Sequence, residues 1–309
     1  MMKMIILGLL KSLENGKIMS DFFILLGGNI LNLGIYEKLI KQNYFVIIVD
    51  WSPTPSLKGK MHLQIDVKDY DSILAKIIEF NIPKVYFKGC YTSIDLAVVS
   101  VVKIYEFFGY VYGGEHYLNA INKGAMTNIW KNAGQLLRNS SVFVDYNDLI
   151  LDSHTSYIII KPNSSASSRA ITIVNKKDVN KIKEAFYLAK LESYDQKVII
   201  EDFIEGTEYT VEMLIDVNGK ASVYAISKKY HNCYLADNKV AIKLHYNPID
   251  IPSQQLHEIA SFGKKCFEAL NLVNCFGHFE MIIDRNGRYH PIEIGARSSG
   301  FIASTLVDK

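Results

Sequence analysis

Alternating apolar and amphipathic stretches between residues 22 and 108 constrain the fold of this chain more than any other feature. The first apolar run, Phe22–Leu26, ends in Gly27-Gly28, and the second, Tyr44–Asp50, ends in an acid. Between these runs, the apolar residues of 31–42 recur at helical spacing. Continuous apolar strands separated by a helix are typical of a parallel sheet covered on both faces. The sequence therefore predicts a β-α-β unit, whose ligands would lie beyond the carboxyl ends of its strands.

The same alternation predicts strands over 61–66 and 83–87. It also predicts helices over 69–81 and 93–108, with Ser93 as the cap of the second helix and Gly109 as its stop. We expect a three-layer, Rossmann-like domain over residues 21–112. The glycine loop 27–34 lacks the G-x-G-x-x-G spacing, so a nicotinamide or flavin cofactor is not expected even though Asp50 ends the second strand.

Composition narrows the range of partners. The 309 residues carry a net charge of +2 with no block of Lys and Arg, so neither nucleic acid nor a membrane is expected as a partner. No apolar run approaches the roughly 18 residues of a membrane span. The four cysteines show no metal-binding spacing, which favours buried thiols in a reducing cytoplasm. Residues 1–20 are expected to form a disordered extension, and an upstream start not used in the cell is the alternative for residues 1–18.

Near the end of the chain, Asn286-Gly287 lies between two apolar-rich runs and predicts a type I′ hairpin turn. Counting outward from this turn, Ile283 faces His290 and Glu280 faces Glu293. Opposed carboxylates, with Cβ atoms roughly 5 Å apart, destabilise a hairpin unless a cation lies between them. Two such carboxylates suit Mg²⁺. A surface hairpin whose glutamates face water is the alternative, and this stretch alone does not decide between the two.

Two lysines occupy positions suited to phosphate groups. Lys123 begins a helix expected over 121–134, where the helix dipole disfavours a cation unless the side chain reaches an anion; a solvated lysine is the simpler alternative. Lys161 ends the apolar strand 157–162 and precedes the small-residue stretch 163–170. The backbone amides of this stretch would form a flap over phosphates. An ordinary serine-rich hairpin loop is the alternative.

Two glutamates flank a turn at Glu205-Gly206. Glu201 ends an apolar run, where an unpaired carboxylate is costly, and an amino-group donor such as adenine would offset that cost. The Asn218-Gly219 hairpin places Lys229 opposite Glu208. A purely structural role also explains that second pairing.

Taken in order, these residues resemble the motifs of the ATP-grasp superfamily, and the resemblance covers most of residues 21–309. The greatest similarity is to its carbamoyl-phosphate-synthase-like and carboxylate–amine ligase branches. The resemblance implies an α/β chain: a Rossmann-like domain over 21–112, then an ATP-grasp domain of α+β type over 113–309. Within the latter, the phosphate flap would belong to a first subdomain (113–196) and the metal site to a second (197–309).

The resemblance also implies a role for each residue that matches an ATP-binding motif. Lys123 and Lys161 would contact the phosphates of ATP. Glu201 would take the adenine amino group, and the backbone of Phe203 and Ile204 would read the edge of the ring. Glu208, the last acid of the E-x-F-I-x-G-x-E pattern, would bind the ribose hydroxyls.

The last motif implies the metal and the chemistry. Glu280 and Glu293 would hold Mg²⁺, and Arg297 would stabilise the transferring phosphoryl group or the acyl phosphate. The usual E-x-N-x-R ending reads Glu293-Ile-Gly295-Ala-Arg297, so one side-chain oxygen is missing. We therefore expect one strongly held Mg²⁺, or a second held mainly by ATP and water.

Two further departures affect the flap and the end of the chain. Ala166 and Ala170 stand where the flaps of the family usually have glycine, which restricts positive φ and stiffens the flap. The chain ends at Lys309, where relatives usually continue, so we expect either a truncated sequence or an incomplete acceptor pocket.

The function that the resemblance implies is an ATP- and Mg²⁺-dependent ligase that activates a small carboxylate as an acyl phosphate for attack by an amine. An ATP-binding protein with little or no turnover is one alternative, and a bicarbonate-using carbamoyl-phosphate or purine-type enzyme is another. The partners would be small-molecule substrates, and a homodimer stays open. The residues that select the acid and the amine are expected in the N-terminal glycine loop and around 230–245.

Overall fold

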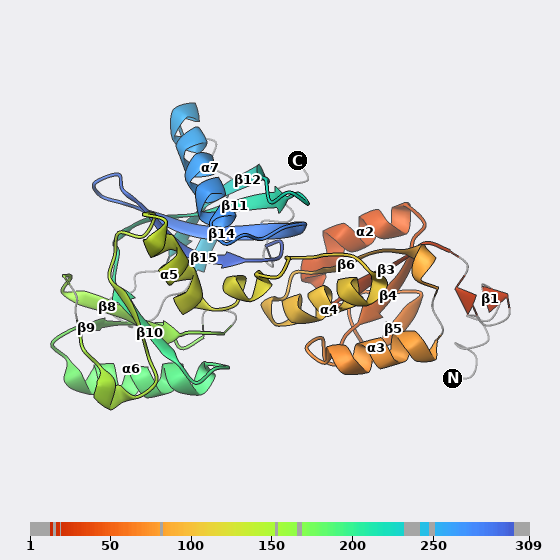
Figure 1. Cartoon of the computed structure of the whole chain (residues 1–309), viewed down its shortest axis with the longest axis horizontal. Helices are drawn as coiled ribbons and strands as arrows, with labels where there is room; N and C mark the ends of the chain where they lie inside the picture. Colours follow the sequence, from red (N-terminus) through yellow and green to blue (C-terminus); the bar gives the residue numbers. More distant parts are fainter. Residues whose placement is uncertain are drawn as a thin grey trace. The chain divides into compact units, whose positions relative to one another are not determined.

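The computed structural model is described here for residues 13–14, 17–18, 20–80, 83–151, 154–165, 169–231, 242–246 and 251–299. The chain divides into two compact units, one formed by residues 1–112 and 297–309 and the other by residues 113–296 (Figure 1). Among the described residues, no helix is long and apolar enough to cross a membrane.

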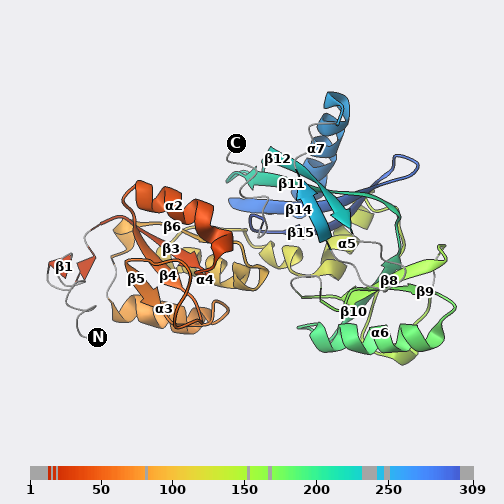
Figure 2. The same ribbon diagram turned by 180° about the vertical axis from the view of Figure 1, so that it is seen from behind.

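The first unit is built on a parallel sheet with helices on both faces. Its strands are β3 (Phe22–Leu26), β4 (Phe45–Val49), β5 (Met61–Leu63) and β6 (Phe87–Thr92), in the order β5-β4-β3-β6. One face carries α2 (Leu33–Lys41), and the other carries α3 (Tyr70–Glu79) and α4 (Val98–Phe108) (Figures 1 and 2). Short 3₁₀ turns are η1 (Ile30–Asn32), η2 (Lys84–Tyr86) and η3 (Asp95–Ala97). The predicted three-layer α/β arrangement is confirmed.

Two boundaries in this unit were predicted wrongly. The strand expected over 83–87 is a 3₁₀ turn followed by β6, which runs on through Gly89. A Cβ at Gly89 would lie 2.5 Å from the ring of Phe23, so this glycine makes room for packing rather than ending a strand. Ser93 does not cap α4, which begins five residues later at Val98. The predicted stop at Gly109 is confirmed by its φ of 86°.

Asp50 closes the glycine loop. Its carboxylate accepts hydrogen bonds from the N–H groups of Gly28 (2.6 Å) and Ser52 (2.8 Å). The amide nitrogen of Asn32 donates to the carbonyl of Gly27 at 2.7 Å. The acid that ends the second strand therefore holds the loop in shape.

A short two-stranded hairpin precedes the parallel sheet. Leu13–Glu14 (β1) pairs antiparallel with Lys17–Ile18 (β2). The rest of the expected extension up to residue 19 lies outside the described residues, as do residues 300–309. Three of the four cysteines are buried free thiols, as predicted, and the fourth falls outside the described residues; the three are Cys90, Cys266 and Cys275.

The second unit contains two antiparallel sheets, of which the first has the order β7-β10-β8-β9. Its strands are β7 (Ser140–Phe143), β8 (Tyr157–Pro162), β9 (Thr172–Asn175) and β10 (Val198–Asp202). Ile158, Ile160 and Ile200 pack against α6 (Val179–Glu192). Because side chains alternate along a strand, Lys161 and Glu201 point to the opposite face. The remaining elements before β10 are η4 (Tyr117–Ala120), α5 (Lys123–Asn132) and η5 (Tyr146–Asp148).

The second sheet has the order β13-β12-β11-β14-β15. Its strands are β11 (Gly206–Ile215), β12 (Ala221–His231), β13 (Ile242–Tyr246), β14 (Cys275–Asp284) and β15 (Tyr289–Gly295). Helix α7 (Ser253–Glu268) places Gly263 against Met213 and Phe279. The residues that alternate with these two, among them Glu212 and Glu280, therefore lie on the other face of the sheet.

The last hairpin pairs Glu280 with Glu293 as predicted, but by a different route. Gly287 has a φ of 76° whereas Asn286 does not have a positive φ, and the N–H of Asp284 donates to the carbonyl of Arg288. The turn is thus one residue longer than a type I′ turn.

The longer turn shifts the strand pairing near it by one residue. Ile283 consequently pairs with Tyr289, and His290 pairs with Ile282 instead of Ile283. A bulge at Glu280/Met281, opposite Pro291, restores the counted register. Proline has no N–H to donate to the ladder, which explains a bulge at this point.

Candidate active site

One face of the five-stranded sheet carries two rows of polar side chains that cross β11, β14 and β15. In the first row, Thr210 pairs with Glu280, which pairs with Glu293. In the second, Glu212 pairs with His278, which pairs with Gly295. Directly opposed residues point to the same side of a sheet. The register therefore gathers three carboxylates and one imidazole on a single face.

Lys229 on β12 bridges two of the predicted site residues. Its ammonium group lies 2.6 Å from a carboxylate oxygen of Glu208 and also bonds to Glu280. Burial opposes the charge of Lys229, but Glu280 and Glu208 outweigh burial and raise its pKa. The predicted pairing of Lys229 with Glu208 is confirmed, and its extension to Glu280 links a ribose candidate to a metal candidate.

His278 also contacts the carboxylate of Glu280. Its Nδ1 lies 2.6 Å from Oε1 of Glu212, and its Nε2 lies 3.2 Å from Oε1 of Glu280. Burial opposes ionisation of Glu280, yet Lys229 and His278 hold its pKa well below the usual range. Glu280 is therefore ionised at neutral pH, as a metal ligand must be.

Lys123 is buried and paired with Glu293 at 3.0 Å, so the solvated alternative is wrong. Asn122 caps α5 by accepting from the N–H of Ala125. The side-chain oxygen of Asn163, which directly follows β8, accepts from the N–H of Gly124 at 2.8 Å. These bonds fix the helix start beside the end of β8, and the ion pair of Lys123 with Glu293 joins it to β15.

Glu201 holds a second buried group of charges. Its two carboxylate oxygens bond to Lys161 at 2.6 Å and to Arg138 at 2.9 Å. Burial raises the pKa of Glu201, but Arg138 and Lys161 outweigh burial and lower the pKa to about 2. Arg138 also donates to the carbonyl of Pro291 on β15. The guanidinium thus ties the first sheet of this unit to the strand that carries Glu293.

Phe203, the flap stretch and Arg297 were also predicted to belong to the site. The N–H of Phe203 donates to the carbonyl of Tyr157, so Phe203 would offer a ligand its carbonyl. Within the flap stretch, residues 166–168 lie outside the described residues, and Ala170 has a φ of 50°, a backbone region that favours glycine. Arg297 belongs to the first unit, where its guanidinium pairs with both carboxylate oxygens of Asp95.

Three polar residues of this site, Arg138, Glu212 and His278, were not identified from the sequence. Arg138 lies in a loop before β7 and belongs to no motif. Glu212 and His278 are recognisable only through register, because each continues the alternation that places Glu208 and Glu280 on the polar face. Counting that alternation from Glu208 through Thr210 to Glu212, and from Glu280 back by two residues to His278, is the signal that would have found the latter two.

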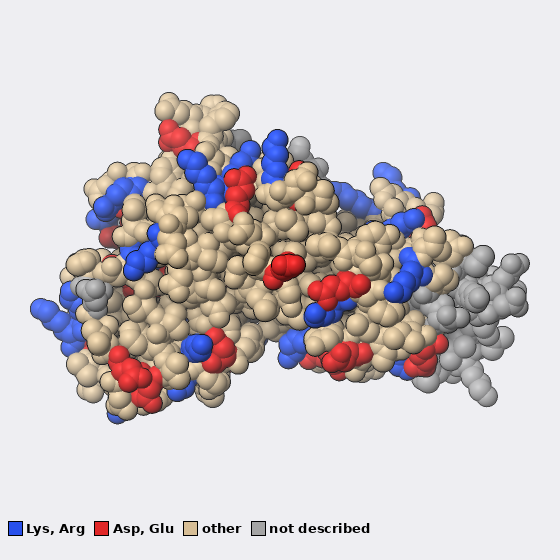
Figure 3. Space-filling model, viewed as in Figure 1, with Lys and Arg blue, Asp and Glu red and all other residues tan. Residues whose placement is uncertain are grey.

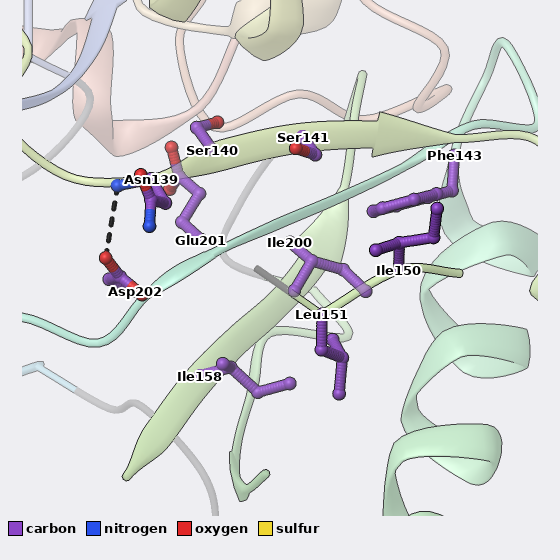
Figure 4. Close-up of a pocket in the computed structure, with 10 residues that line it drawn as sticks. All are labelled: Asn139, Ser140, Ser141, Phe143, Ile150, Leu151, Ile158, Ile200, Glu201 and Asp202. Carbon is purple, nitrogen blue, oxygen red and sulfur yellow. Dashed lines mark hydrogen bonds between the residues drawn. The ribbon is translucent and has the colours of Figure 1, made fainter. Parts of the chain in front are cut away.

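A hollow at the edge of the sheet β7-β10-β8-β9 is lined in part by Glu201 (Figure 4). Ile158, Ile200 and Leu151 line its apolar side, and at one end the N–H of Asn139 donates to the carboxylate of Asp202. Both isoleucines belong to the core packed against α6. The hollow is thus a gap at the rim of this core, and the charged side chains mark the candidate site.

Charged side chains of both signs are mixed on the face of the molecule drawn in Figure 3. On the face drawn in Figure 3, positive and negative side chains are scattered among uncharged ones, with no continuous basic stripe among the described residues. Within the described part of the chain, no three His, Cys, Asp or Glu side chains already form a metal-binding group. The donor types nevertheless fit Mg²⁺, because Glu280 and Glu293 are directly opposed and each is neutralised by a lysine that a cation would replace.

Comparison with known protein families agrees with this geometry. Residues 155–306, just under half of the chain, match the ATP-grasp domain family. A D-alanine--D-alanine ligase of Buchnera aphidicola is 30% identical over 147 residues, which cover 44% of this chain and 43% of that protein. A D-alanine--D-alanine ligase of Marinomonas sp. is 31% identical over 219 residues, covering 67% of this chain and 65% of that protein. The chain thus spans less than half the length of the first of these relatives.

Solved structures agree on the fold. An L-amino acid ligase from Bacillus licheniformis superimposes with a TM-score of 0.73 at 19% identity, covering 90% of this chain and 67% of that one. A D-alanine--D-alanine ligase from Bacillus anthracis gives a TM-score of 0.63 at 16% identity, covering 92% of this chain and 89% of that one. Identities this low support a shared fold and leave the substrates open.

Proposed function

This chain carries an ATP-grasp domain and belongs to that superfamily, and on this premise we propose that it is an ATP- and Mg²⁺-dependent ligase. It would activate a small carboxylate as an acyl phosphate for attack by an amine. The observation that carries the proposal is the pair Glu280 and Glu293, opposed on one sheet face, with Lys229 and Lys123 as their respective partners. Two carboxylates paired with two buried ammonium groups are suited to a metal ion and polyphosphate.

Each charged residue has a part in this proposal. Glu280 and Glu293 would hold Mg²⁺, which when bound neutralises the negative charge of the phosphates. Lys123 would exchange Glu293 for a phosphate oxygen once the metal takes that carboxylate. Phosphoryl transfer needs mainly positioning and charge neutralisation, so no protein nucleophile is required. Arg297, four residues after Glu293 in the motif, would stabilise the transferring phosphoryl group.

The nucleotide would be held by residues of the first sheet and the following turn. Lys161 would face the phosphates, and Glu201 would accept the adenine amino group. Both are already fixed by a buried ion pair, so little side-chain entropy would be lost on binding. The carbonyl of Phe203 and the backbone of Ile204 would read the ring edge, and Glu208 would bind the ribose.

Amino acids are the first acids and amines to test, because the relatives named above are ligases of D-alanine and of L-amino acids. The experiment measures phosphate release from ATP and Mg²⁺ with pairs drawn from D- and L-amino acids, with bicarbonate as a separate acid. A productive pair should raise phosphate release well above the ATP-only rate. Glu293→Ala should abolish the increase, and Glu205→Gln, an exposed acid outside the site, should retain it. Undiminished turnover in Glu293→Ala would contradict the metal assignment.

A second candidate function is nucleotide binding without turnover. Gly295 favours it, because the oxygen expected at this position of the motif is missing. Calorimetry that finds ATP binding, together with no phosphate release across the whole panel, would select this alternative.

A further inference from the structure

Gly295, which has no side-chain oxygen, lies next to the imidazole of His278. Gly295 is directly opposite His278, and His278 is directly opposite Glu212 on the next strand. The three positions form one row across β15, β14 and β11, adjacent to the row that holds Glu293 and Glu280. A side chain absent from one strand is thus faced by an imidazole on its neighbour.

The orientation of this imidazole is fixed. Nδ1 lies 2.6 Å from a carboxylate oxygen of Glu212, and both residues are buried. Nε2 points to Glu280, 3.2 Å from its Oε1. In metal sites, a ligating histidine usually gives its other ring N–H to a carboxylate, which sets the tautomer and the ring orientation. Glu212 and His278 already have that arrangement, with Nε2 directed at the carboxylate proposed to bind the metal.

We propose that His278 is a third protein ligand of the metal ion at Glu280 and Glu293, in place of the oxygen that Gly295 lacks, and that Glu212 positions it. This inference rests on the metal site of the proposed function. Nε2 would leave Glu280 and bind the metal in its unprotonated form when Glu280 itself turns to the ion, with any proton on Nε2 released to solvent and the proton on Nδ1 kept toward Glu212. Imidazole suits first-row transition ions better than Mg²⁺. The site would therefore prefer Mn²⁺ or Co²⁺ to Mg²⁺, unlike a site built from oxygen atoms alone.

Pulsed electron paramagnetic resonance of bound Mn²⁺ tests this directly, because it detects nitrogen bonded to the ion. The probe is MnCl₂ with the full chain, with and without ADP. The wild-type spectrum should show coupling to ¹⁴N, and protein labelled with ¹⁵N-histidine should show ¹⁵N coupling instead. The chain has eight histidines, so the variant His278→Gln assigns the signal and should abolish it. His257→Gln, at an exposed position on α7, is the matched control and should keep it.

Metal titrations supply a second readout. His278→Gln should weaken Mn²⁺ binding by roughly 10- to 100-fold while changing Mg²⁺ binding less, so the preference for Mn²⁺ disappears. Glu212→Gln keeps the imidazole but loosens it, and should weaken Mn²⁺ binding by roughly 10-fold. Adding Gly295→Asn to His278→Gln should improve Mg²⁺ binding without restoring nitrogen coupling. If His278→Gln fails to fold, Glu212→Gln supplies the assignment: a weaker histidine coupling in this variant supports His278, because Glu212 contacts that imidazole, and an unchanged coupling overturns the proposal.

The outcomes separate this inference from the proposed function. Bound Mn²⁺ without histidine coupling, or coupling that persists in His278→Gln, overturns the role of His278 and leaves the ligase proposal standing. Coupling lost in His278→Gln, in a protein that turns over no acid and amine, supports His278 and counts against the ligase. Absence of any Mn²⁺ binding overturns both.

Discussion

Replacing Glu201 by glutamine would leave two buried cations, Arg138 and Lys161, facing a neutral amide. Removing one partner of a buried ion pair typically costs about 3–5 kcal/mol. The pKa of Glu201 gives an independent figure, because a fall from 4.5 to about 2 corresponds to roughly 3 kcal/mol at about 1.4 kcal/mol for each pKa unit. We therefore expect Glu201→Gln to lower the free energy of unfolding of the second unit by about 3 kcal/mol at pH 7.

The pH dependence of this difference follows from the direction of the pKa shift. The folded-state pKa of Glu201 is depressed, so its stabilisation is present above the unfolded pKa near 4.5 and is lost as pH falls toward about 2. The glutamine variant lacks this titration. The difference between wild type and variant should accordingly shrink, by about 1 kcal/mol between pH 7 and pH 4.

Urea denaturation followed by tryptophan fluorescence measures this free energy. The chain has two tryptophans, so a Trp51→Phe background leaves the buried Trp130 as a reporter of the second unit alone. Glu205→Gln is the matched control, since Glu205 pairs with Arg285 at the surface and such pairs contribute at most about 1 kcal/mol. A cost below about 1 kcal/mol for Glu201→Gln, or a difference that does not narrow at pH 4, would refute the reasoning.

Three further predictions concern charge and backbone. Lys229→Met should destabilise the second unit by about 2–4 kcal/mol, because the partly buried carboxylates of Glu280 and Glu208 lose their shared buried cation. Mg²⁺ at about 10 mM should raise the melting temperature of this variant more than that of wild type. Gly287→Ala should lower the free energy of unfolding by about 1 kcal/mol, because Gly287 has a positive φ. Gly206→Ala should lower it more, because a Cβ at Gly206 would lie 2.2 Å from a backbone oxygen, and urea denaturation measures both. Ala170→Gly should be neutral or stabilising by up to about 1 kcal/mol in the same assay, because the φ of 50° is strained for alanine.

The strands and helices could largely be predicted because their signals are local. Apolar runs and the residues that end them lie within a few positions of each other, as with Gly109 at the end of α4. Gly89 shows the limit of such signals, because the glycine inside β6 is explained by the ring of Phe23, which is close in space but far away in sequence. The pairing of Glu280 with Glu293 was predicted correctly although the turn was not, because the longer turn and the bulge opposite Pro291 shift the register in opposite directions.

The residues of the candidate site likewise differ in whether a local sequence signal identifies them. Lys161, Glu201 and Glu208 belong to stretches that resemble ATP-grasp motifs, and this resemblance is what singled them out as candidates. Arg138 could not, because its partner Glu201 is distant in sequence and no periodicity leads to it. The sequence alone favours a solvated side chain for Lys123, because its partner Glu293 lies on a strand 170 residues away.

The most direct test of the proposed acyl transfer follows an oxygen atom. An acid that supports phosphate release is labelled with ¹⁸O in its carboxylate and incubated with ATP, Mg²⁺, the amine and the chain. Activation as an acyl phosphate predicts one ¹⁸O in each inorganic phosphate released, read by mass spectrometry or ³¹P nuclear magnetic resonance. Phosphate without ¹⁸O, or label found in AMP, would contradict the central claim that this site phosphorylates a carboxylate.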